Sequence, residues 1–371
     1  MDIREFVDVI GGEFYTGVPD SQLKALCNYL INTYGIGEKH LIAANEGNAV
    51  GMAAGHYLAT REIPVVYMQN SGIGNMINPY ASLMQEEVYG IPCIFVIGWR
   101  GEPGIQDEPQ HIFQGKTTLP LLSDMEIDFF IVDRETTVET LKEKAEKFQR
   151  ELDKGRSVAY VVKKGSLLYD EKVVYKNEYT IRREDVLKII TKYSENDVVI
   201  STTGKVSREL FEIREEKDKN HARDFLTVGS MGHCSSIALK IALEKKNRRI
   251  WCIDGDGAML MHMGAMAVVG SMAPENFVHI VMNNEAHETV GGMPTVGKSI
   301  EFTEIARACG YRRVESVRDF LDLERILESV RADRELTFIE IKCGLGSREN
   351  LGRPTTTPKE NRDCFMKFLQ D

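Results

Sequence analysis

The sequence lacks the paired cysteines that hold zinc ribbons and small disulfide-rich proteins together. Seven cysteines are spread over 371 residues, and no two of them form a C-x-x-C pair. A zinc ribbon needs such pairs, and a disulfide framework usually needs an even number of cysteines. We therefore expect reduced thiols and a cytoplasmic protein.

Long apolar runs and excess positive charge are also missing. No stretch reaches the roughly 18 apolar residues of a membrane-spanning helix, and the opening MDIREFVDVIGGEFYTG is acidic where a secretion signal is basic. The net charge of −10 would repel nucleic acids and anionic membrane surfaces. We expect no export, no membrane partner and no nucleic-acid partner, and an anionic substrate would need a local basic pocket.

Three motifs of nucleotide and metal enzymes are absent. The sequence contains no G-x-x-x-x-G-K-[ST], no H-E-x-x-H and no G-x-G-x-x-G directly after an apolar strand. A P-loop, a zincin site and a dinucleotide fingerprint each need those residues at those spacings. These three classes of enzyme are therefore excluded.

Short runs of apolar and β-branched residues recur along the whole chain, separated by stretches long enough for a helix. Such nearly continuous apolar strands are typical of parallel sheets with helices on both faces. The sequence predicts strands at residues 13–16, 40–43, 65–69, 93–98, 128–132 and 158–162, and again at 198–201, 225–228, 249–253, 278–282 and 338–342. The fold class is therefore α/β, with two layered domains of similar size.

The domain boundary is expected in the segment 163–180, which is rich in Lys, Asp and Tyr and poor in periodic apolar positions. At about 150 residues per domain, 371 residues suit two domains. We predict domains at 1–170 and 181–371 with a linker at 171–180. A closing helix is expected to begin near Pro358, because proline favours the first turn of a helix.

Polar residues follow two of the predicted strands in the second half. Gly255, Asp256 and Gly257 end one strand, and Asn283 with Asn284 ends the next. Such residues emerge at the carboxyl edge of a parallel sheet, where ligands bind. Carboxylate and amide oxygens suit Mg²⁺, and glycines let a backbone approach phosphates. Taken alone, however, G-D-G is equally well explained as a turn after a strand.

The spacing from G-D-G to the paired asparagines resembles the cofactor motif of thiamine-diphosphate enzymes. The resemblance implies that Asp256 and Asn284 are ligands of Mg²⁺ and that Ala286 supplies a carbonyl oxygen to the metal. It also implies that Gly255 and Gly257 lie against the diphosphate of the cofactor.

The same resemblance implies a glutamate in the other domain that hydrogen-bonds N1′ of the cofactor pyrimidine. Glu46 fits, because it follows a predicted strand and precedes a helix of small residues at 47–59. A general base at that place would promote proton removal from the thiazolium ring. The alternative is that Glu46 only stabilises the first turn of its helix.

Two further stretches are similar to this family. In TVGSMGHC, Gly229 and Met231 stand where the family presents a carbonyl and an apolar side chain to the bent cofactor, although Met231 could also be core filler. In QNSGIGN, Ser71 and Gly72 resemble the turn that lines the pyrimidine.

Within this superfamily the chain resembles the phosphonopyruvate decarboxylases over nearly its whole length. The matching stretches are GVPDS at 17–21 and the segments at 98–115, 202–210 and 347–358. The resemblance implies two thiamine-diphosphate-binding domains, pyrimidine-binding and diphosphate-binding, without a middle domain. It also implies decarboxylation of 3-phosphonopyruvate to phosphonoacetaldehyde and CO₂ in phosphonate biosynthesis, by a homo-oligomer with active sites between subunits.

A phosphonate beside a carboxylate needs clustered cations, and Arg is well suited to bind it. The candidate substrate ligands are Lys205, Arg208, His233, Arg348 and Arg353, and further catalytic candidates are Asp20 and His111. Charged loop residues are, however, commonly only solvated. Two alternatives stay open: a sulfopyruvate decarboxylase, and a catalytically silent subunit that binds thiamine diphosphate.

Overall fold

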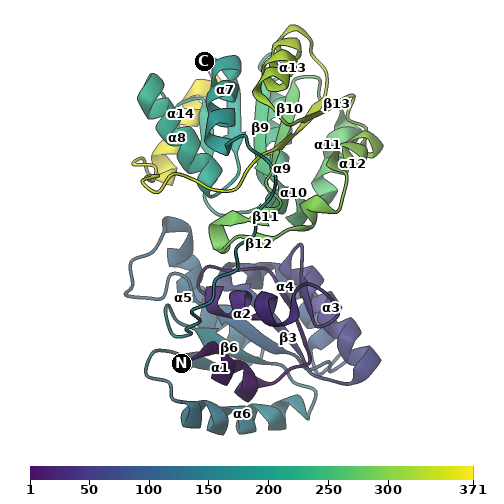
Figure 1. Cartoon of the computed structure of the whole chain (residues 1–371), viewed down its shortest axis with the longest axis vertical. Coiled ribbons are helices and arrows are strands. Elements are labelled where there is room, and N and C mark those ends of the chain that lie inside the picture. The colour runs from purple at the N-terminus through teal and green to yellow at the C-terminus, as the bar shows by residue number, and fades with distance from the viewer. Residues whose placement is uncertain (371) are drawn as a thin grey trace. The chain divides into compact units, whose positions relative to one another are not determined.

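The chain forms two compact units. The computed structural model describes residues 1–370 and, of Thr289, only the backbone. The first unit comprises Met1–Val174 with Val290–Met293, and the second comprises Tyr175–Thr289 with Pro294–Asp371. The division after Val174 lies inside the predicted linker 171–180. Figure 1 shows one sheet in each unit.

The first unit is built on a six-stranded parallel sheet of order β2-β1-β3-β4-β6-β5. Its strands are β1 (Phe14–Gly17), β2 (His40–Ile42), β3 (Pro64–Gln69), β4 (Ile94–Gly98), β5 (Asp128–Val132) and β6 (Val158–Val162). Its helices are α1 (Ile3–Ile10), α2 (Lys24–Tyr34), α3 (Glu46–Thr60), α4 (Ile73–Pro79), α5 (Pro109–Asp124) and α6 (Val138–Leu152), with the short turns η1 (Asn70–Gly72) and η2 (Tyr80–Met84).

Strand residues of this sheet alternate between two apolar cores, one on each face. In β3, Val65 and Tyr67 pack into the core that includes residues of α1, α2 and α6, whereas Val66 and Met68 pack into the core that includes α3 and α4. Side chains of a strand point alternately to opposite faces, so a sheet buried on both sides needs apolar residues at nearly every position. This requirement explains the continuous apolar runs of the sequence.

The second unit repeats this plan with a six-stranded parallel sheet of order β13-β14-β10-β9-β7-β8. Its sheet strands are β7 (Val198–Ser201), β8 (Asp224–Leu226), β9 (Ile250–Gly255), β10 (Phe277–Asn283), β13 (Arg313–Val317) and β14 (Thr337–Lys342), and the short β11 (Ala286–His287) and β12 (Met293–Pro294) lie outside it. Its helices are α7 (Arg183–Ser194), α8 (Lys205–Lys217), α9 (Cys234–Glu244), α10 (Asp256–Met261), α11 (Gly264–Met272), α12 (Phe302–Cys309), α13 (Phe320–Ala332) and α14 (Pro358–Gln370), with the turns η3 (Glu288–Val290) and η4 (Val296–Lys298).

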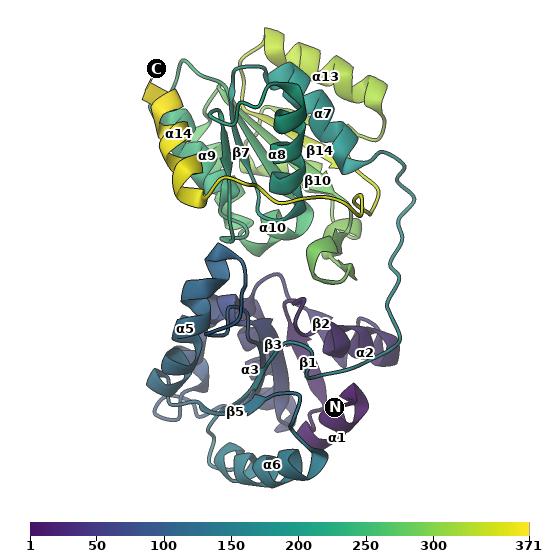
Figure 2. The same ribbon diagram turned by 90° about the vertical axis from the view of Figure 1, so that its left-hand side faces the viewer.

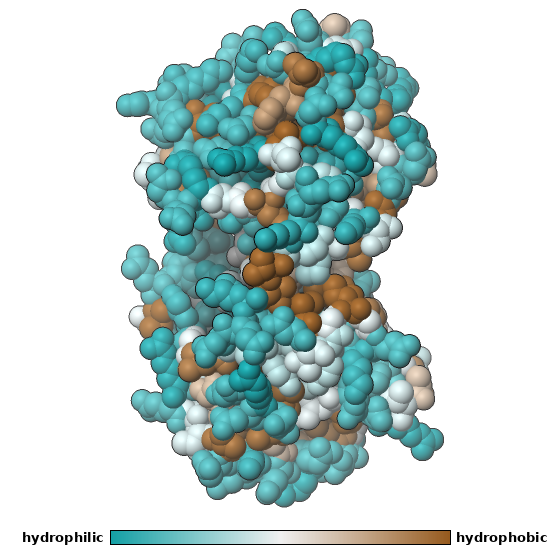
Figure 3. Space-filling model, in the orientation of Figure 1, coloured by the Kyte–Doolittle hydropathy of each residue, from teal (hydrophilic) through white to brown (hydrophobic). Residues whose placement is uncertain are grey.

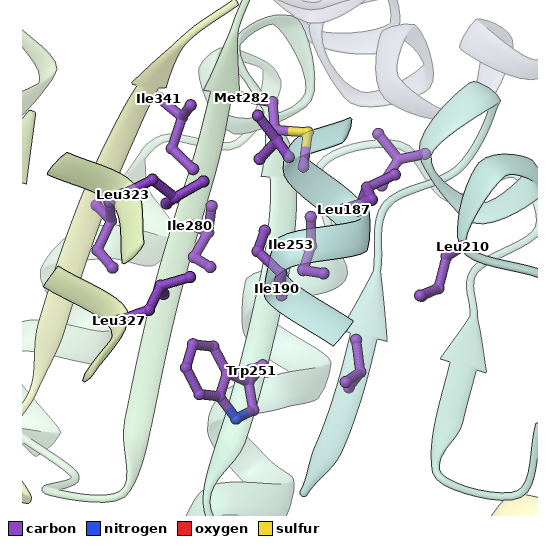
Figure 4. Packing of buried hydrophobic residues seen from close by; sticks show 14 of the residues in the cluster. Leu187, Ile190, Leu210, Trp251, Ile253, Ile280, Met282, Leu323, Leu327 and Ile341 are labelled. Atoms are coloured by element: carbon purple, nitrogen blue, oxygen red, sulfur yellow. The ribbon is translucent and has the colours of Figure 1, made fainter. Parts of the chain in front are cut away.

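Two cores again lie on opposite faces of the sheet. Figure 2 shows helices on both sides of this sheet. Figure 4 shows one of them, where Trp251 and Ile253 of β9 and Ile280 of β10 meet Leu187 of α7 and Leu323 of α13. Each fully buried side chain of this size contributes roughly 1.5–3 kcal/mol of transfer free energy. The strands between the two cores are therefore held firmly, and their carboxyl ends are fixed points for the loops that follow.

The predicted fold class is confirmed: two α/β domains with parallel sheets covered on both faces, and no middle domain. The predicted strands fall on the observed ones to within about two residues at each end. Strand β13 was not predicted, because RVESV places polar residues among only two valines at the edge of the sheet. The closing helix α14 begins at Pro358, as expected.

In the view of Figure 3, hydrophilic residues cover most of both units, and apolar residues form groups among them. Within residues 1–370, none of the helices combines the length and the apolar character that crossing a membrane requires.

Candidate active site

Polar side chains gather after the carboxyl ends of neighbouring strands in the first unit. Asp20 follows β1, Glu46 follows β2, Ser71 and Gly72 follow β3, and Arg100 follows β4. Because the sheet is parallel, all of these loops leave the same edge. Ligands of open α/β sheets bind at that edge. The fold therefore brings the predicted residues Asp20, Glu46, Ser71 and Gly72 to one edge of the sheet, together with Arg100, which was not predicted.

Glu46 is the first residue of α3, whose N-terminus is capped by the side chain of Asn45 accepting from the Asn48 backbone N–H at 2.9 Å. Its carboxylate is buried and accepts a hydrogen bond of 2.7 Å from Asn75 Nδ2. A Cβ on Gly72 would collide with this carboxylate. Glycine is therefore required at Gly72 for the Glu46 side chain to lie where it does. Burial raises the pKa of Glu46, and the hydrogen bond from Asn75 opposes that rise.

Asp20 is completely buried and is held by two donors. Its Oδ1 accepts from Gln69 Nε2 at 2.5 Å, and its Oδ2 accepts from the Gln22 backbone N–H at 3.0 Å. Burial raises the pKa of Asp20, and the hydrogen bond from Gln69 and the charge of Arg100 counteract part of that rise. Ser71 donates to Gln69 Oε1 at 2.8 Å. Gln69 thus links two predicted site residues that lie far apart in the sequence.

In the second unit, Asp256 begins α10 directly after β9 and is buried. Its Oδ2 accepts a hydrogen bond of 2.5 Å from Thr295 Oγ1. Burial raises the pKa of Asp256 to about 7, because the charged form is poorly solvated there. A buried carboxylate is costly unless a cation or hydrogen bonds stabilise it, so Asp256 is chemically suited to receive a cation.

The two asparagines after β10 play different parts. Asn283 is completely buried. Its side-chain amide donates to Glu340 Oε1 at 2.8 Å and to the Gly297 carbonyl at 3.1 Å. Its Oδ1 accepts from the Glu285 backbone N–H at 3.0 Å. Asn284 accepts from the Ala286 N–H at 3.1 Å and donates to Glu288. Asn283 is therefore committed to the fold, which leaves Asn284 as the carboxamide of this turn with the simpler set of partners.

The predicted turn at Gly229 and Met231 packs against the start of α10. A Cβ on Gly257 would lie 3.5 Å from Met231 Cε and 2.8 Å from His287 Cε1, and a Cβ on Gly232 would lie 2.8 Å from the Ala258 carbonyl. Gly229 and Gly232 have φ of 68° and 83°, and the non-glycine Ser230 between them has φ of 48°. Left-handed backbone at a non-glycine residue is costly and is concentrated at functional sites. Burial lowers the pKa of His287 to about 4, so this ring is neutral.

Three predicted substrate cations already have partners inside the second unit. Lys205 Nζ lies 2.7 Å from Glu288 Oε1, Arg208 donates to the carbonyl oxygens of residues 351 and 352, and Arg348 pairs with Glu184 at 3.1 Å and with Glu212. The two arginines fasten the segment before α14 to helices α7 and α8. Substrate binding by these side chains stays a prediction, and each of them would have to exchange a partner.

The remaining predicted residues are Arg353, His233 and His111. Arg353 is exposed, and His233 is exposed at the start of α9 with its ring 4.3 Å from that of His262. His111 is buried in the first turn of α5, and burial together with Arg100 lowers its pKa to about 4. It is therefore a neutral imidazole at physiological pH. The roles assigned to these three residues stay predictions.

Sequence reasoning missed several residues at both edges. Asn75 and Gln69 support the carboxylates of the first unit, and Thr295 and Glu285 support the turn of the second. Gln69 stands in the QNSGIGN stretch and could have been predicted, because it is a polar residue that ends a strand. Thr295 lies 39 residues beyond Asp256, and no local pattern points to it.

Comparison with known protein families agrees with this two-unit arrangement. The family described as "Thiamine pyrophosphate enzyme, N-terminal TPP binding domain" matches residues 5–120. The family described as "Thiamine pyrophosphate enzyme, C-terminal TPP binding domain" matches residues 202–341. Thiamine pyrophosphate is another name for thiamine diphosphate. The first match lies within the first unit and includes Glu46. The second match includes Asp256 and lies within the second unit except for Val290–Met293.

Three curated relatives match most of the chain. A phosphonopyruvate decarboxylase of Streptomyces viridochromogenes is 32% identical over 97% of this chain and 92% of its own length. One of Streptomyces hygroscopicus is 30% identical over 98% of this chain and 92% of its own length. A sulfopyruvate decarboxylase of Methanosarcina acetivorans is 26% identical over 87% of this chain and 86% of its own length.

Proposed function

The chain belongs to the family of thiamine-diphosphate-dependent decarboxylases that includes the phosphonopyruvate decarboxylases, and we propose on this premise that it decarboxylates 3-phosphonopyruvate to phosphonoacetaldehyde. The observation that carries the proposal is similarity to two phosphonopyruvate decarboxylases over 97% and 98% of the chain. The proposed place of the reaction is phosphonate biosynthesis.

The residues of the second unit fit a Mg²⁺ ion and a diphosphate. Asp256 and Asn284 offer one carboxylate and one carboxamide oxygen, which are ligands that Mg²⁺ prefers, and Ala286 is the proposed carbonyl ligand. Gly257 leaves open a space in which a Cβ would meet His287. Gly255 at the end of β9 and Gly257 in the first turn of α10 would let the diphosphate approach the backbone.

The residues of the first unit fit the pyrimidine end of the cofactor. Thiamine diphosphate, when bound, supplies the carbon nucleophile and the electron sink for decarboxylation. Glu46 would hold a proton between its carboxyl group and N1′ of the pyrimidine, and its raised pKa favours such sharing. Ser71 and Gly72 would line this ring. Gly229 and Met231 would support the cofactor from the second unit.

The anionic substrate is proposed to meet polar groups of both units. Asp20 and His111 stay candidates for proton transfer near the reacting carbon. Lys205, Arg208, His233, Arg348 and Arg353 stay candidates for the phosphonate. Since a phosphonate accepts hydrogen bonds from arginine in pairs, it could replace the carboxylates that now hold Arg348.

We further propose a homo-oligomer in which Glu46 of one subunit and Asp256 of another serve the same site. In this arrangement each site needs one Glu46 and one Asp256, and the two residues come from different subunits. No partner other than a second copy of the chain is proposed.

The test is release of CO₂ from phosphonopyruvate, sulfopyruvate and pyruvate, each with and without thiamine diphosphate and Mg²⁺. We expect cofactor-dependent release chiefly from phosphonopyruvate. Sulfopyruvate is the second candidate, because a sulfopyruvate decarboxylase also matches 87% of the chain. Preference for sulfopyruvate would overturn the substrate and keep the chemistry. Cofactor binding without release from any of the three acids would favour a silent subunit.

A further inference from the structure

The segment Tyr175–Tyr179, which directly follows Val174, lies beside the turn at Asn284–Ala286. Its side chains alternate: Tyr175, Asn177 and Tyr179 are half-buried, and the residues between them are exposed. Such alternation is the pattern of an extended chain with one face on the protein. This segment belongs to no helix or strand within residues 1–370. The polar contacts of those side chains therefore hold it in place.

All three half-buried side chains donate to the turn or to its neighbour. Tyr175 OH donates to Glu285 Oε2 at 2.7 Å, and Tyr179 OH donates to Glu285 Oε1 at 2.8 Å. Asn177 Nδ2 donates to the Asn284 carbonyl at 2.9 Å and to the Cys343 carbonyl at 3.1 Å. Each of the two tyrosine hydroxyls therefore donates to a different oxygen of the Glu285 carboxylate.

Glu285 needs this support for two reasons. Its backbone has φ of 61°, a left-handed conformation that is unfavourable for a non-glycine residue. Its side chain is only 3% exposed, and a buried carboxylate is stable only when hydrogen-bonded. Hydrogen bonds to a carboxylate are about twice as strong as those between neutral groups. The phenols therefore offset both costs at the residue that stands between Asn284 and Ala286.

We propose that Tyr175, Asn177 and Tyr179 are positioning residues that hold the Asn284–Ala286 turn in the conformation that binds the divalent metal. The inference rests on the proposed function, because that function assigns Asn284 and Ala286 to Mg²⁺. The three residues act through Glu285 and the Asn284 backbone and do not themselves touch the metal. Without them the turn would leave the left-handed conformation part of the time, and the two oxygen ligands would separate.

The test is the double variant Tyr175→Phe with Tyr179→Phe, which removes both hydroxyl donors and keeps both rings. In the experiment, Mg²⁺ is titrated into protein that is saturated with thiamine diphosphate, and a calorimeter records the heat of binding. This measures the Mg²⁺ affinity independently of catalytic activity. We expect affinity to fall roughly 10–100-fold, as for other residues that support metal ligands. At saturating Mg²⁺, the maximal rate of CO₂ release should return to that of the unaltered protein.

The control is Tyr169→Phe, a tyrosine of the first unit that contacts Asn32 and not the turn. Its Mg²⁺ affinity should not change. If the double variant does not fold, Tyr179→Phe alone carries the test, with an expected loss of about tenfold. Unchanged affinity in a folded variant, or a loss of maximal rate that saturating Mg²⁺ does not restore, overturns the inference alone. If the unaltered protein binds neither Mg²⁺ nor thiamine diphosphate, the proposed function fails and the inference fails with it.

Discussion

Glu46 and Asp256 occupy similar places in the two units, and their surroundings differ. Each is the first residue of a helix that follows a parallel strand at the carboxyl edge, and burial raises the pKa of each. Glu46 has a neutral amide, Asn75, as its side-chain donor and the Gly72 backbone against its carboxylate. Asp256 has the Thr295 hydroxyl as donor and lies near the oxygen-rich turn that follows β10.

This difference shows how one local design can serve two kinds of chemistry. A buried carboxylate can keep its proton or be neutralised by a cation. A lone carboxylate beside an amide is suited to hold and share a proton. A carboxylate near a carboxamide and backbone carbonyls is suited to bind a metal. We therefore expect Glu46 to serve proton transfer and Asp256 to serve metal binding.

The largest expected effect is on turnover by Glu46→Gln. The amide keeps the shape of the side chain and can still meet Asn75, but it cannot exchange a proton with the cofactor pyrimidine. We expect the rate of CO₂ release to fall by roughly 10²–10⁴-fold, the usual contribution of a general acid or base. Calorimetry should show thiamine diphosphate and Mg²⁺ binding largely as before. Ordinary turnover by this variant would remove Glu46 from the mechanism.

Mixing two inactive variants sharpens the comparison further. Glu46→Gln and Asp256→Ala each disable every site of a homodimer, but a mixed dimer with sites between subunits keeps one site with both carboxylates. Random reassembly of equal amounts should therefore restore roughly a quarter of the sites. The measurement is CO₂ release after joint refolding, with each variant refolded alone as the control. If the mixture remains as inactive as its components, the site uses both carboxylates of one chain.

A smaller and more selective effect is expected from Thr295→Val. Valine has nearly the shape of threonine but lacks the hydroxyl that orients Asp256. Residues that orient a metal ligand typically contribute 10–100-fold to metal affinity, and we expect a loss of about that size. Activity against Mg²⁺ concentration should show a shifted midpoint and an unchanged plateau. Thr337→Val is the matched control, since that buried threonine lies at the start of β14 and donates to the Glu335 carbonyl at 2.9 Å.

Much of the fold could be predicted because buried parallel strands need apolar residues at nearly every position. Strands such as Val158–Val162 stand out for this reason, whereas the edge strand Arg313–Val317 does not. Glu46 and Asp256 could be found because each directly follows or nearly follows such a strand. Their chemical roles came from the family resemblance and not from the pattern itself.

The supporting residues could not be predicted, because they come from loops without periodicity. Tyr175 meets Glu285 across 110 residues of sequence. Charge patterns also could not separate a substrate cation from an internal ion pair. Arg348 has the sequence features expected of a phosphonate ligand, and only the fold shows its contacts with Glu184 and Glu212.

The smallest expected effect is on stability, and it tests the burial of Glu46 without any cofactor. Because burial raises the pKa of Glu46 above its ordinary 4.5, the folded chain keeps a proton that the unfolded chain releases as pH rises. Stability is therefore lost between the unfolded and the folded pKa, and Glu46→Gln escapes this loss. We expect the variant to melt a few degrees higher at pH 8, since 1 kcal/mol moves the melting temperature of a domain this size by roughly 2–4 °C. The gain should vanish below pH 4, where Glu46 is protonated in both the folded and the unfolded state of the unaltered protein.

Exposed Glu87→Gln is the control and should not change the melting temperature at either pH. If the difference in melting temperature between the variant and the unaltered protein is the same at pH 8 and at pH 4, Glu46 is solvated in the folded protein. Glu46 and Asp256 would then not share the burial on which their comparison rests.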